Sequence, residues 1–242
     1  MGKKALILCG GWDGHQPKLV SERFRKFLVS EGFEVKVEED IQVTKDPETY
    51  NDLDLFIPIW TMCKDPLGYG FFEPLLSAVG GGMGLAGNHG GMCDAFRNSV
   101  EYQFMTGANW VSHPGGDGTK YRINIRGKSN PLTEGINDFE VASEQYYLHV
   151  DPANEVLATT RFPTVQWYHA ANGEVDVPQV WTRKWGYGRV FYNALGHHDD
   201  VFEIPEAWEL MKRGLLWAAE SKRIAVEKGL KADDWKSPVK MY

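Results

Sequence analysis

The sequence predicts an α/β protein with an open, mostly parallel sheet, helices on both faces and a strand-rich C-terminal half. Two observations predict the sheet. Apolar runs typical of buried parallel strands alternate with helical patterns over residues 5–91, and several of these runs end in glycine-rich turns. A third observation, closely spaced short strand patterns over residues 121–195, predicts the different second half. At 242 residues and 43% hydrophobic content, the chain can bury one sizeable core.

The first elements form a βαβαβ alternation. Residues 5–9 are a continuous apolar run that ends at a glycine pair, and Pro17 then begins a helix that closes near Gly32. Residues 33–37 and 53–60 are the next strands. A helix over residues 74–79 leads to a fourth strand at residues 83–86. Right-handed crossovers would make these strands parallel, so that ligands bind beyond their carboxyl ends.

The second half contains more strands and ends in a long helix. Pro205 begins that helix, whose apolar residues recur on one face until about Ala219. From about residue 224 the chain is polar and rich in lysine, and we expect an extended tail that wraps the surface or contacts a second subunit. The domain is therefore placed at residues 1–221 and a C-terminal extension at 222–242. Strands are predicted at residues 121–125, 156–159, 164–168, 177–181 and 189–195.

Composition excludes several classes of protein. A net charge of -7 argues against a nucleic-acid partner, because such proteins usually present a basic face. The first apolar run is too short for a signal peptide or a membrane span, so we expect a cytoplasmic protein that binds no membrane. Cys9, Cys63 and Cys93 are odd in number and lack CxxC spacing, which favours reduced thiols over disulfides or a cysteine zinc site.

A glycine-flanked histidine is the most informative motif. Residues 82–91 read GMGLAGNHGG, an apolar segment that runs into a GxHxG turn and then a helix-compatible stretch. Hydrolases use such a strand-to-helix elbow to hold a Ser or Cys above the sheet, and its glycines permit the unusual backbone dihedrals. Here the residue is His89. The start of a helix disfavours a protonated imidazole, so we predict a neutral base or a metal ligand.

Several other histidines follow strand-like runs. His15, His113, His197 and His198 do so, as does the elbow histidine. If these strands are parallel, their ends share one edge of the sheet and the imidazoles converge in one cleft. The alternative is that each histidine only caps its own loop. His149 and His169 fit that alternative better, because no glycine turn lies beside either of them.

Several further positions have two interpretations each. Trp60 either stacks on a sugar ring or belongs to the core. Asn88 either offers its amide to substrate or tolerates a left-handed backbone conformation. Asp94 and Arg97 are three residues apart on a helix, which favours a structural ion pair. Asp199 and Asp200 either orient His197 by accepting a hydrogen bond from it or cap the next segment.

Together these segments resemble the ThuA-like (trehalose utilisation) proteins. The resemblance covers the chain from Lys4 to about Ala219. It implies a flavodoxin-like sheet related to the class I glutamine amidotransferases but without their catalytic Cys, so amidotransferase activity is not expected. The matching segments are residues 57–62, 84–92, 94–97, 102–105, 110–115, 144–147, 178–183, 186–192 and 195–197.

The resemblance also implies site residues and a substrate class. Glu144 joins the site, although Ser143 precedes it where the family commonly has Asp. ThuA-like proteins are associated with disaccharide catabolism through 3-keto sugars, so a keto-sugar or keto-glycoside is the implied substrate. We assign base or ligand roles to His89 and Glu144. His113 and His197 would polarise the carbonyl or bind a metal.

Alternatives remain open at this point. His15, Trp60 and Asn88 are expected to bind substrate. A divalent metal such as zinc would accept His15, His89, His113, Glu144 and His197 as ligands, but no HExxH, HxH or HxxxH spacing is present. The main alternatives are a non-catalytic sugar-binding or regulatory domain and a metal-dependent hydrolase. A homo-oligomer is a further expectation.

Overall fold

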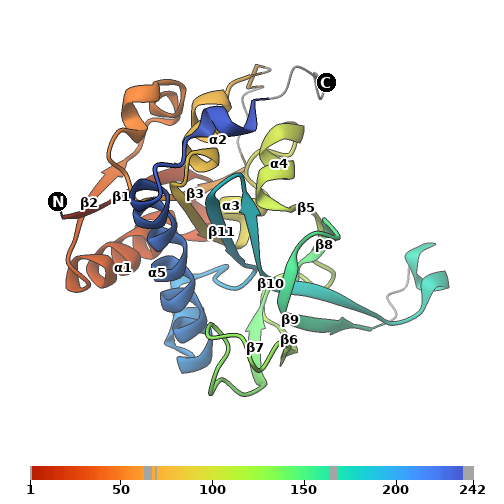
Figure 1. Cartoon of the computed structure of the whole chain (residues 1–242). Helices are drawn as coiled ribbons and strands as arrows, with labels where there is room; N and C mark the ends of the chain where they lie inside the picture. The colour runs from red at the N-terminus through yellow and green to blue at the C-terminus, as the bar shows by residue number, and fades with distance from the viewer. Residues whose placement is uncertain (1, 63–66, 69, 164–167, 237–242) are drawn as a thin grey trace.

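The computed structural model of the chain describes residues 2–62, 67–68, 70–163 and 168–236. Among these residues, nine strands form one sheet in the order β2-β1-β3-β4-β11-β10-β9-β6-β7, and β5 and β8 form a separate pair (Figure 1). The strands are β1 Lys3–Gly11, β2 Phe33–Glu38, β3 Leu55–Thr61, β4 Gly84–Asn88, β5 Ala108–Ser112, β6 Thr119–Ile125, β7 Phe139–Ser143, β8 Tyr147–Val150, β9 Glu155–Phe162, β10 Val175–Trp185 and β11 Gly188–Asn193. The α-helices are α1 Pro17–Ser30, α2 Glu73–Gly80, α3 His89–Cys93, α4 Val100–Thr106 and α5 Pro205–Glu227.

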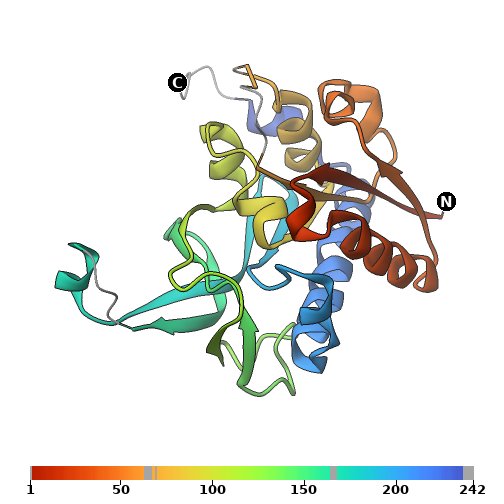
Figure 2. The same ribbon diagram turned by 180° about the vertical axis from the view of Figure 1, so that it is seen from behind.

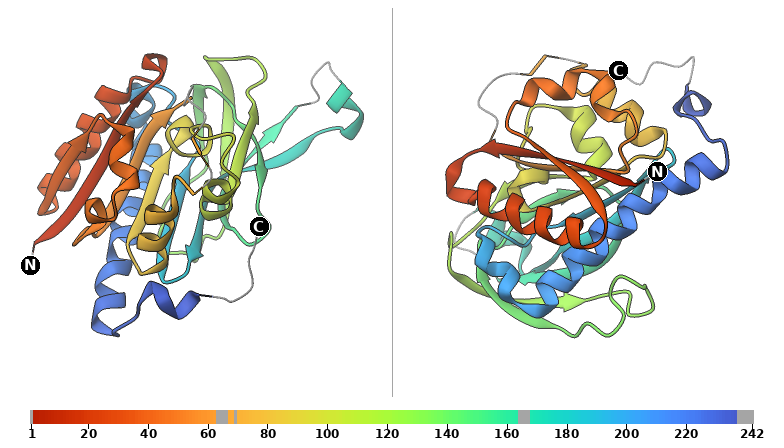
Figure 3. Two further views of the ribbon diagram at one scale, coloured as in Figure 1. Left: turned by 90° about the horizontal axis from the view of Figure 1, so that it is seen from above. Right: turned by 90° about the vertical axis from the view of Figure 1, so that its left-hand side faces the viewer.

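The N-terminal half is the predicted parallel sheet. β1 pairs in parallel with β2 and β3, and β4 pairs in parallel with β3 and β11. Side chains alternate between the faces, so Ala5 and Ile7 of β1 pack in one core with α1 and α5, while Leu6 and Leu8 pack in the other with α2. Helices therefore cover both faces (Figure 3), which confirms the α/β fold class.

The strand-rich second half continues the same sheet in antiparallel pairing. β10 pairs with β11 and β9, and β6 pairs with β9 and β7, all antiparallel. The outer parts of β9 and β10 extend away from the rest of the molecule (Figures 1 and 2). Of the strand predicted at 164–168, residues 164–167 lie outside the described residues. Tyr168 begins a short 3-10 helix, Tyr168–Asn172, so the prediction is wrong at that residue.

The C-terminal helix is longer than the sequence suggested. α5 continues to Glu227, past the point at which we expected a tail, because Ala225 is still buried. A Cβ on Gly82 would lie only 2.4 Å from Ala225 Cβ, which shows how closely this turn packs against the helix. After α5, the ring of Trp235 lies 5.0 Å from that of Tyr187. The expected extended tail is thus wrong for residues 224–227, which are helical, whereas the Trp235 contact agrees with a segment that wraps the surface; residues 237–242 lie outside the described residues.

Two structural expectations from composition can be compared with the described residues. Cys9 and Cys93 are buried free thiols, as predicted, and burial raises the pKa of both. Cys63 lies outside the described residues. Within the described part of the chain, no helix is both long enough and apolar enough to cross a membrane.

Candidate active site

Four polar side chains from separate segments meet beyond the carboxyl ends of the parallel strands. His15 ends a short 3-10 helix after β1, His89 directly follows β4, His197 lies in the loop after β11, and Glu144 directly follows β7. One nitrogen or oxygen atom from each lies within 4.8 Å of the others. We call these four residues the histidine–glutamate cluster. The predicted convergence of distant histidines is confirmed for three of them.

The carboxylate of Glu144 is at the centre of this cluster. Its Oε2 atom lies 3.1 Å from His197 Nδ1, 3.2 Å from His89 Nε2 and 3.8 Å from His15 Nε2. His89 Nε2 is also 3.3 Å from His197 Nδ1. All four side chains are less than a tenth exposed. The cluster is thus compact and almost fully shielded from water.

The elbow holds its histidine in an unusual backbone conformation. His89 has a φ of 45°, in the left-handed region that residues other than glycine seldom adopt. The following glycines are needed for space: a Cβ on Gly90 would lie 2.6 Å from His15 Cε1, and one on Gly91 would lie 2.9 Å from Ile59 Cα. The GxHxG turn therefore has the close packing that its sequence predicted.

Hydrogen bonding fixes which nitrogen of His89 carries the proton. Its Nδ1 lies 2.8 Å from the carbonyl oxygen of Ala194, which can only accept, so Nδ1 donates. Burial lowers the pKa of His89 to about 3. The imidazole is therefore neutral at ordinary pH, and Nε2 presents a lone pair to Glu144. The prediction of a neutral histidine agrees with this, but burial is the main cause.

The other members of the cluster are anchored as well. Burial acts to raise the pKa of Glu144, but the imidazoles of His15 and His197 beside its carboxylate outweigh burial and hold the pKa well below its usual range. The Tyr121 hydroxyl donates to the Glu144 carbonyl oxygen at 3.0 Å. His15 Nδ1 lies 2.9 Å from the hydroxyl oxygen of Thr61. The carboxylate is consequently ionised and its side-chain neighbours are held in place.

A more exposed rim surrounds the cluster. His113, in the loop after β5, places Nε2 3.6 Å from Glu144 Oε1 and is 37% exposed at its side chain. Trp12 is 44% exposed, and its ring lies 5.0 Å from that of His15. Tyr146 stacks on His89 with 3.9 Å between ring centroids. His113 thus joins the site as predicted, at its accessible side.

Some candidate residues have other positions. Trp60 is half-buried and packs against the core, and a Cβ on Gly10 would meet its ring at 2.4 Å. Asn88 is buried, and its Nδ2 donates to the carbonyl oxygens of Leu195 and Gly196. Its φ of -130° makes the left-handed interpretation wrong. The structure therefore favours the core interpretation of Trp60 and gives the Asn88 amide backbone partners.

The acidic residues near the site have structural partners. Asp94 and Arg97 form the expected ion pair, with 2.5 Å between Oδ1 and Nε. Asp199 pairs with Arg23 at 2.7 Å, so its carboxylate bonds a guanidinium of α1. His198 Nδ1 lies 3.8 Å from the exposed Asp117 at the rim. These pairs fix loops around the cluster.

Three neighbours of the cluster were not singled out from the sequence. Trp12 lies in the glycine-rich loop after β1, so the signal that identified His15 also covers it. Thr61, the last residue of β3, is likewise at the carboxyl edge. Tyr146 is two residues beyond Glu144 and was matched without a role. Trp12 and Thr61 could have been found from their positions at the ends of strands. The stacking of Tyr146 on His89 can be recognised only in the three-dimensional structure.

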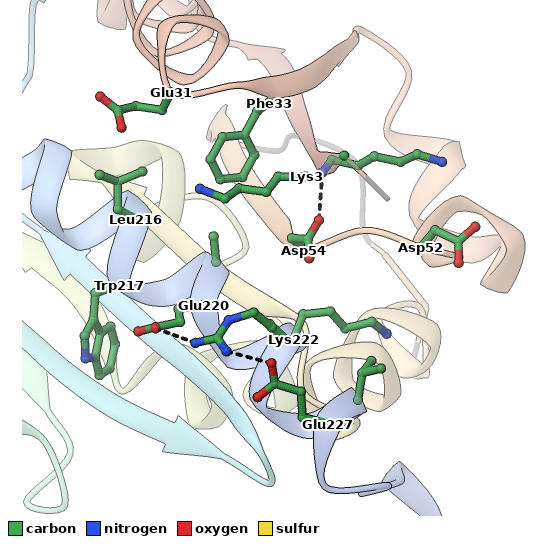
Figure 4. A pocket seen from close by; sticks show the side chains of 15 residues that line it. Lys3, Glu31, Phe33, Asp52, Asp54, Leu216, Trp217, Glu220, Lys222 and Glu227 are labelled. Carbon is green, nitrogen blue, oxygen red and sulfur yellow. Dashed lines mark hydrogen bonds and ion pairs between the residues drawn. The ribbon is translucent and has the colours of Figure 1, made fainter.

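A pocket lies away from the histidine–glutamate cluster. A pocket of about 730 Å³ opens near the start of β1 and β2, at the opposite edge of the sheet (Figure 4). Lys3, Phe33 and Trp217 line it. Three of its charged groups are engaged with one another, because Arg223 bridges Glu220 and Glu227. Among its lining residues there is no histidine or cysteine, so we place the candidate active site at the histidine–glutamate cluster despite the size of this pocket.

Comparison with known proteins relates this fold to solved structures. A putative ThuA-like protein from Bacteroides uniformis ATCC 8492 has a TM-score of 0.69 at 18% identity, covering 91% of this chain and 92% of that one. Another from Parabacteroides merdae ATCC 43184 has a TM-score of 0.67 at 20% identity, covering 92% and 91%. A cytoplasmic protein of Salmonella typhimurium LT2 has a TM-score of 0.59 at 13% identity, covering 94% and 99%. At these identities the likeness establishes the fold alone.

Sequence comparison gives the family. No curated protein matches this chain in sequence. The model of the ThuA family, described as trehalose utilisation, matches residues 4–218 and therefore includes every member of the histidine–glutamate cluster. The chain belongs to the ThuA family.

Proposed function

We propose that this protein is an enzyme of carbohydrate breakdown that acts on an oxidised sugar, a 3-keto sugar or keto-glycoside, by acid–base chemistry. Its family implies a role in trehalose utilisation. The observation that carries the proposal is the meeting of a carboxylate and several imidazoles at one strained elbow. Strained backbone of this kind concentrates at functional sites.

A ketone makes the neighbouring C–H bond acidic. When a base takes that proton, the C–H electron pair forms a carbon–carbon double bond and the carbonyl π electrons move to oxygen. Hydrogen-bond donors or positive charge around that oxygen stabilise the enolate. Return of the electrons re-forms the ketone and expels a glycosidic oxygen from the carbon beyond, and the departing oxygen takes up a proton. Protonation of the enolate carbon instead gives enolisation alone.

We assign proton transfer to the rim and binding of the carbonyl oxygen to the buried cluster. The 3.6 Å separation between His113 Nε2 and Glu144 Oε1 is too long for a hydrogen bond, so this partly exposed nitrogen remains available for a substrate proton. His89 is too buried to reach a carbon on a sugar ring. We therefore assign proton transfer to His113 and place the carbonyl oxygen toward the cluster. Trp12, rather than Trp60, is the exposed ring beside which a sugar would lie.

Substrate comparison in deuterated water tests this proposal. Purified protein is incubated separately with trehalose, 3-keto-trehalose and simple esters, and products are followed by mass spectrometry and NMR. We expect consumption only of the keto-sugar: release of the glycosidic alcohol where the enolate eliminates, and deuterium at the carbon next to the ketone in those molecules whose enolate is protonated again. Cleavage of the esters alone would support a hydrolase instead. Sugar binding without turnover would support a binding module.

A variant pair makes the test specific to the rim. His113→Ala should slow turnover by about 10²- to 10⁴-fold, the usual contribution of an acid–base group. His149→Ala is the matched control because His149 is an exposed histidine on β8, outside the site. Equal activity of the two variants would remove His113 from the mechanism.

The setting of the reaction completes the proposal. We propose a cytoplasmic enzyme with a small carbohydrate as its partner, in line with the acidic charge and the expected reduced thiols. The Salmonella structural neighbour is described as a cytoplasmic protein.

A further inference from the structure

We infer that the histidine–glutamate cluster is the ligand set for one divalent transition-metal ion, with zinc as the best match. The inference deepens the proposed function by naming a cofactor for the same site, and its catalytic meaning rests on that proposal. Metal binding itself is measured without any substrate.

The first argument is a count of protons within the cluster. His89 Nδ1 donates to Ala194, so in the neutral ring the lone pair of Nε2 points toward Glu144 Oε2, which also carries lone pairs. His197 Nδ1 faces both atoms, at 3.1 and 3.3 Å, but this nitrogen carries at most one proton and so can donate to only one of them. Electron-rich atoms therefore converge with too few protons between them. A cation at their centre removes this repulsion.

The second argument is the size of the cluster. Zinc binds imidazole nitrogen and carboxylate oxygen at about 2.0–2.2 Å, so neighbouring ligand atoms of a tetrahedral site are separated by roughly 3.3–3.6 Å. The separations among His89, His197 and Glu144 are 3.1, 3.2 and 3.3 Å, close to that range. His15 lies at 3.8 Å from Glu144, slightly outside it. Three ligands are thus nearly in place and the fourth needs a small movement.

The third argument is the support behind the ligands. Metal-bound histidines usually donate their second ring nitrogen to a carbonyl, carboxylate or water, which orients the ring. His89 does this with Ala194, and His15 Nδ1 is held by Thr61 Oγ1 at 2.9 Å. Glu144 is fixed through its carbonyl oxygen by Tyr121. These contacts hold the rings of His89 and His15 and the backbone of Glu144 in place around the common centre.

The donor types narrow the choice of metal. Three imidazoles and one carboxylate suit zinc and other first-row ions, whereas magnesium and calcium prefer oxygen ligands alone. Imidazoles bind a metal through a neutral nitrogen and a carboxylate binds in its ionised form, so the bound set carries one negative charge, which a divalent ion more than compensates. Less than a tenth of each imidazole in the cluster is exposed, so a metal ion bound there would exchange slowly with ions in bulk water.

Metal titration tests the inference directly. Protein without a His-tag is stripped with chelator, checked by circular dichroism and titrated with Zn²⁺ and Co²⁺. We expect one equivalent of either ion per chain, intense visible absorption of four-coordinate Co²⁺, and a higher melting temperature. A folded protein that binds no stoichiometric ion would overturn the inference.

Variants locate the ion in the cluster. Glu144→Gln keeps the size of the side chain and should abolish stoichiometric Co²⁺ absorption, as should His197→Ala. Thr61→Val, which removes only the support of His15, should weaken Zn²⁺ affinity by about 10- to 100-fold. His149→Ala should bind as the unmodified protein does. Unchanged Co²⁺ spectra and affinity in both Glu144→Gln and His197→Ala would contradict the assignment.

The two proposals fail in different ways. Stoichiometric metal without any turnover of the keto-sugar would leave the metal site standing and remove the proposed reaction. Full turnover by the folded, metal-free protein would keep the reaction and overturn the metal as its cofactor.

Discussion

The two edges of the parallel sheet differ in where they place polar groups and backbone strain. At the carboxyl edge, Gln16, Met62 and His89 have positive φ values although none is glycine, and the nearby polar side chains are buried. At the opposite edge Asp52 is the one such residue among those described, and Arg223 in the pocket pairs with Glu220 and Glu227 near solvent. The pocket and the cluster of reactive side chains therefore lie at opposite edges of the sheet. Strain and buried polar groups are the better guide to the site.

The largest expected effect comes from the carboxyl edge. His89→Ala removes a nitrogen from the cluster toward which the substrate carbonyl oxygen is placed, so turnover of a 3-keto-glycoside should fall by about 10²- to 10³-fold, the usual cost of losing one group that stabilises charge on that oxygen. Steady-state kinetics measure this, with circular dichroism to show that the fold is retained. Retained activity in this variant would mean that the strained edge is not the reactive one.

A substitution at the opposite edge should separate stability from activity. A Cβ on Gly84, at the start of β4, would lie 2.3 Å from the carbonyl oxygen of Ala218 in α5. Gly84→Ala should therefore lower the free energy of unfolding by about 1–3 kcal/mol, the usual cost of overpacking. Urea unfolding measures this loss, while kcat per folded molecule should stay the same. A large drop in kcat would show that this edge of the sheet also affects catalysis, contrary to the prediction.

The smallest effect is expected within the pocket itself. Glu31 is exposed on the pocket wall. Glu31→Gln should change the free energy of unfolding by less than about 0.5 kcal/mol and leave kcat and KM unchanged. Parallel urea unfolding and kinetic assays on this variant provide the check. If KM for the keto-sugar rose clearly, the pocket would have to be counted as part of the substrate site.

Local patterns were sufficient for the parallel half of the fold. The apolar run before Gly10, the helix begun by Pro17 and the GxHxG elbow each carry their own signal, and topology rules then bring the strand ends together. His15, His89 and His197 could be grouped for that reason. The pairing of β6, β7, β9 and β10 depends on contacts between distant segments, so the sequence predicted several of these strands but not their order.

Other parts of the site depend on contacts that no local pattern reveals. Glu144 follows β7, a strand not anticipated although Phe139 and Val141 alternate with polar residues, and its place came from family resemblance. The Nδ1 bond from His89 to Ala194 sets the tautomer and is visible only in three dimensions. The end of α5 was misplaced because Ala225 sits in a polar stretch yet packs against Gly82. Each of these features depends on a contact with a residue far away in the sequence.

Glu144 has one further consequence through its position in the sheet. Its strand, β7, lies at the far end of the antiparallel extension, whereas the clustered histidines follow strands of the parallel half. The four side chains can come together only when the parallel and antiparallel parts of the sheet are in the correct register. A small shift between β11 and β10, where the two parts meet, would therefore separate Glu144 from the histidines and disable the chemistry without unfolding either part.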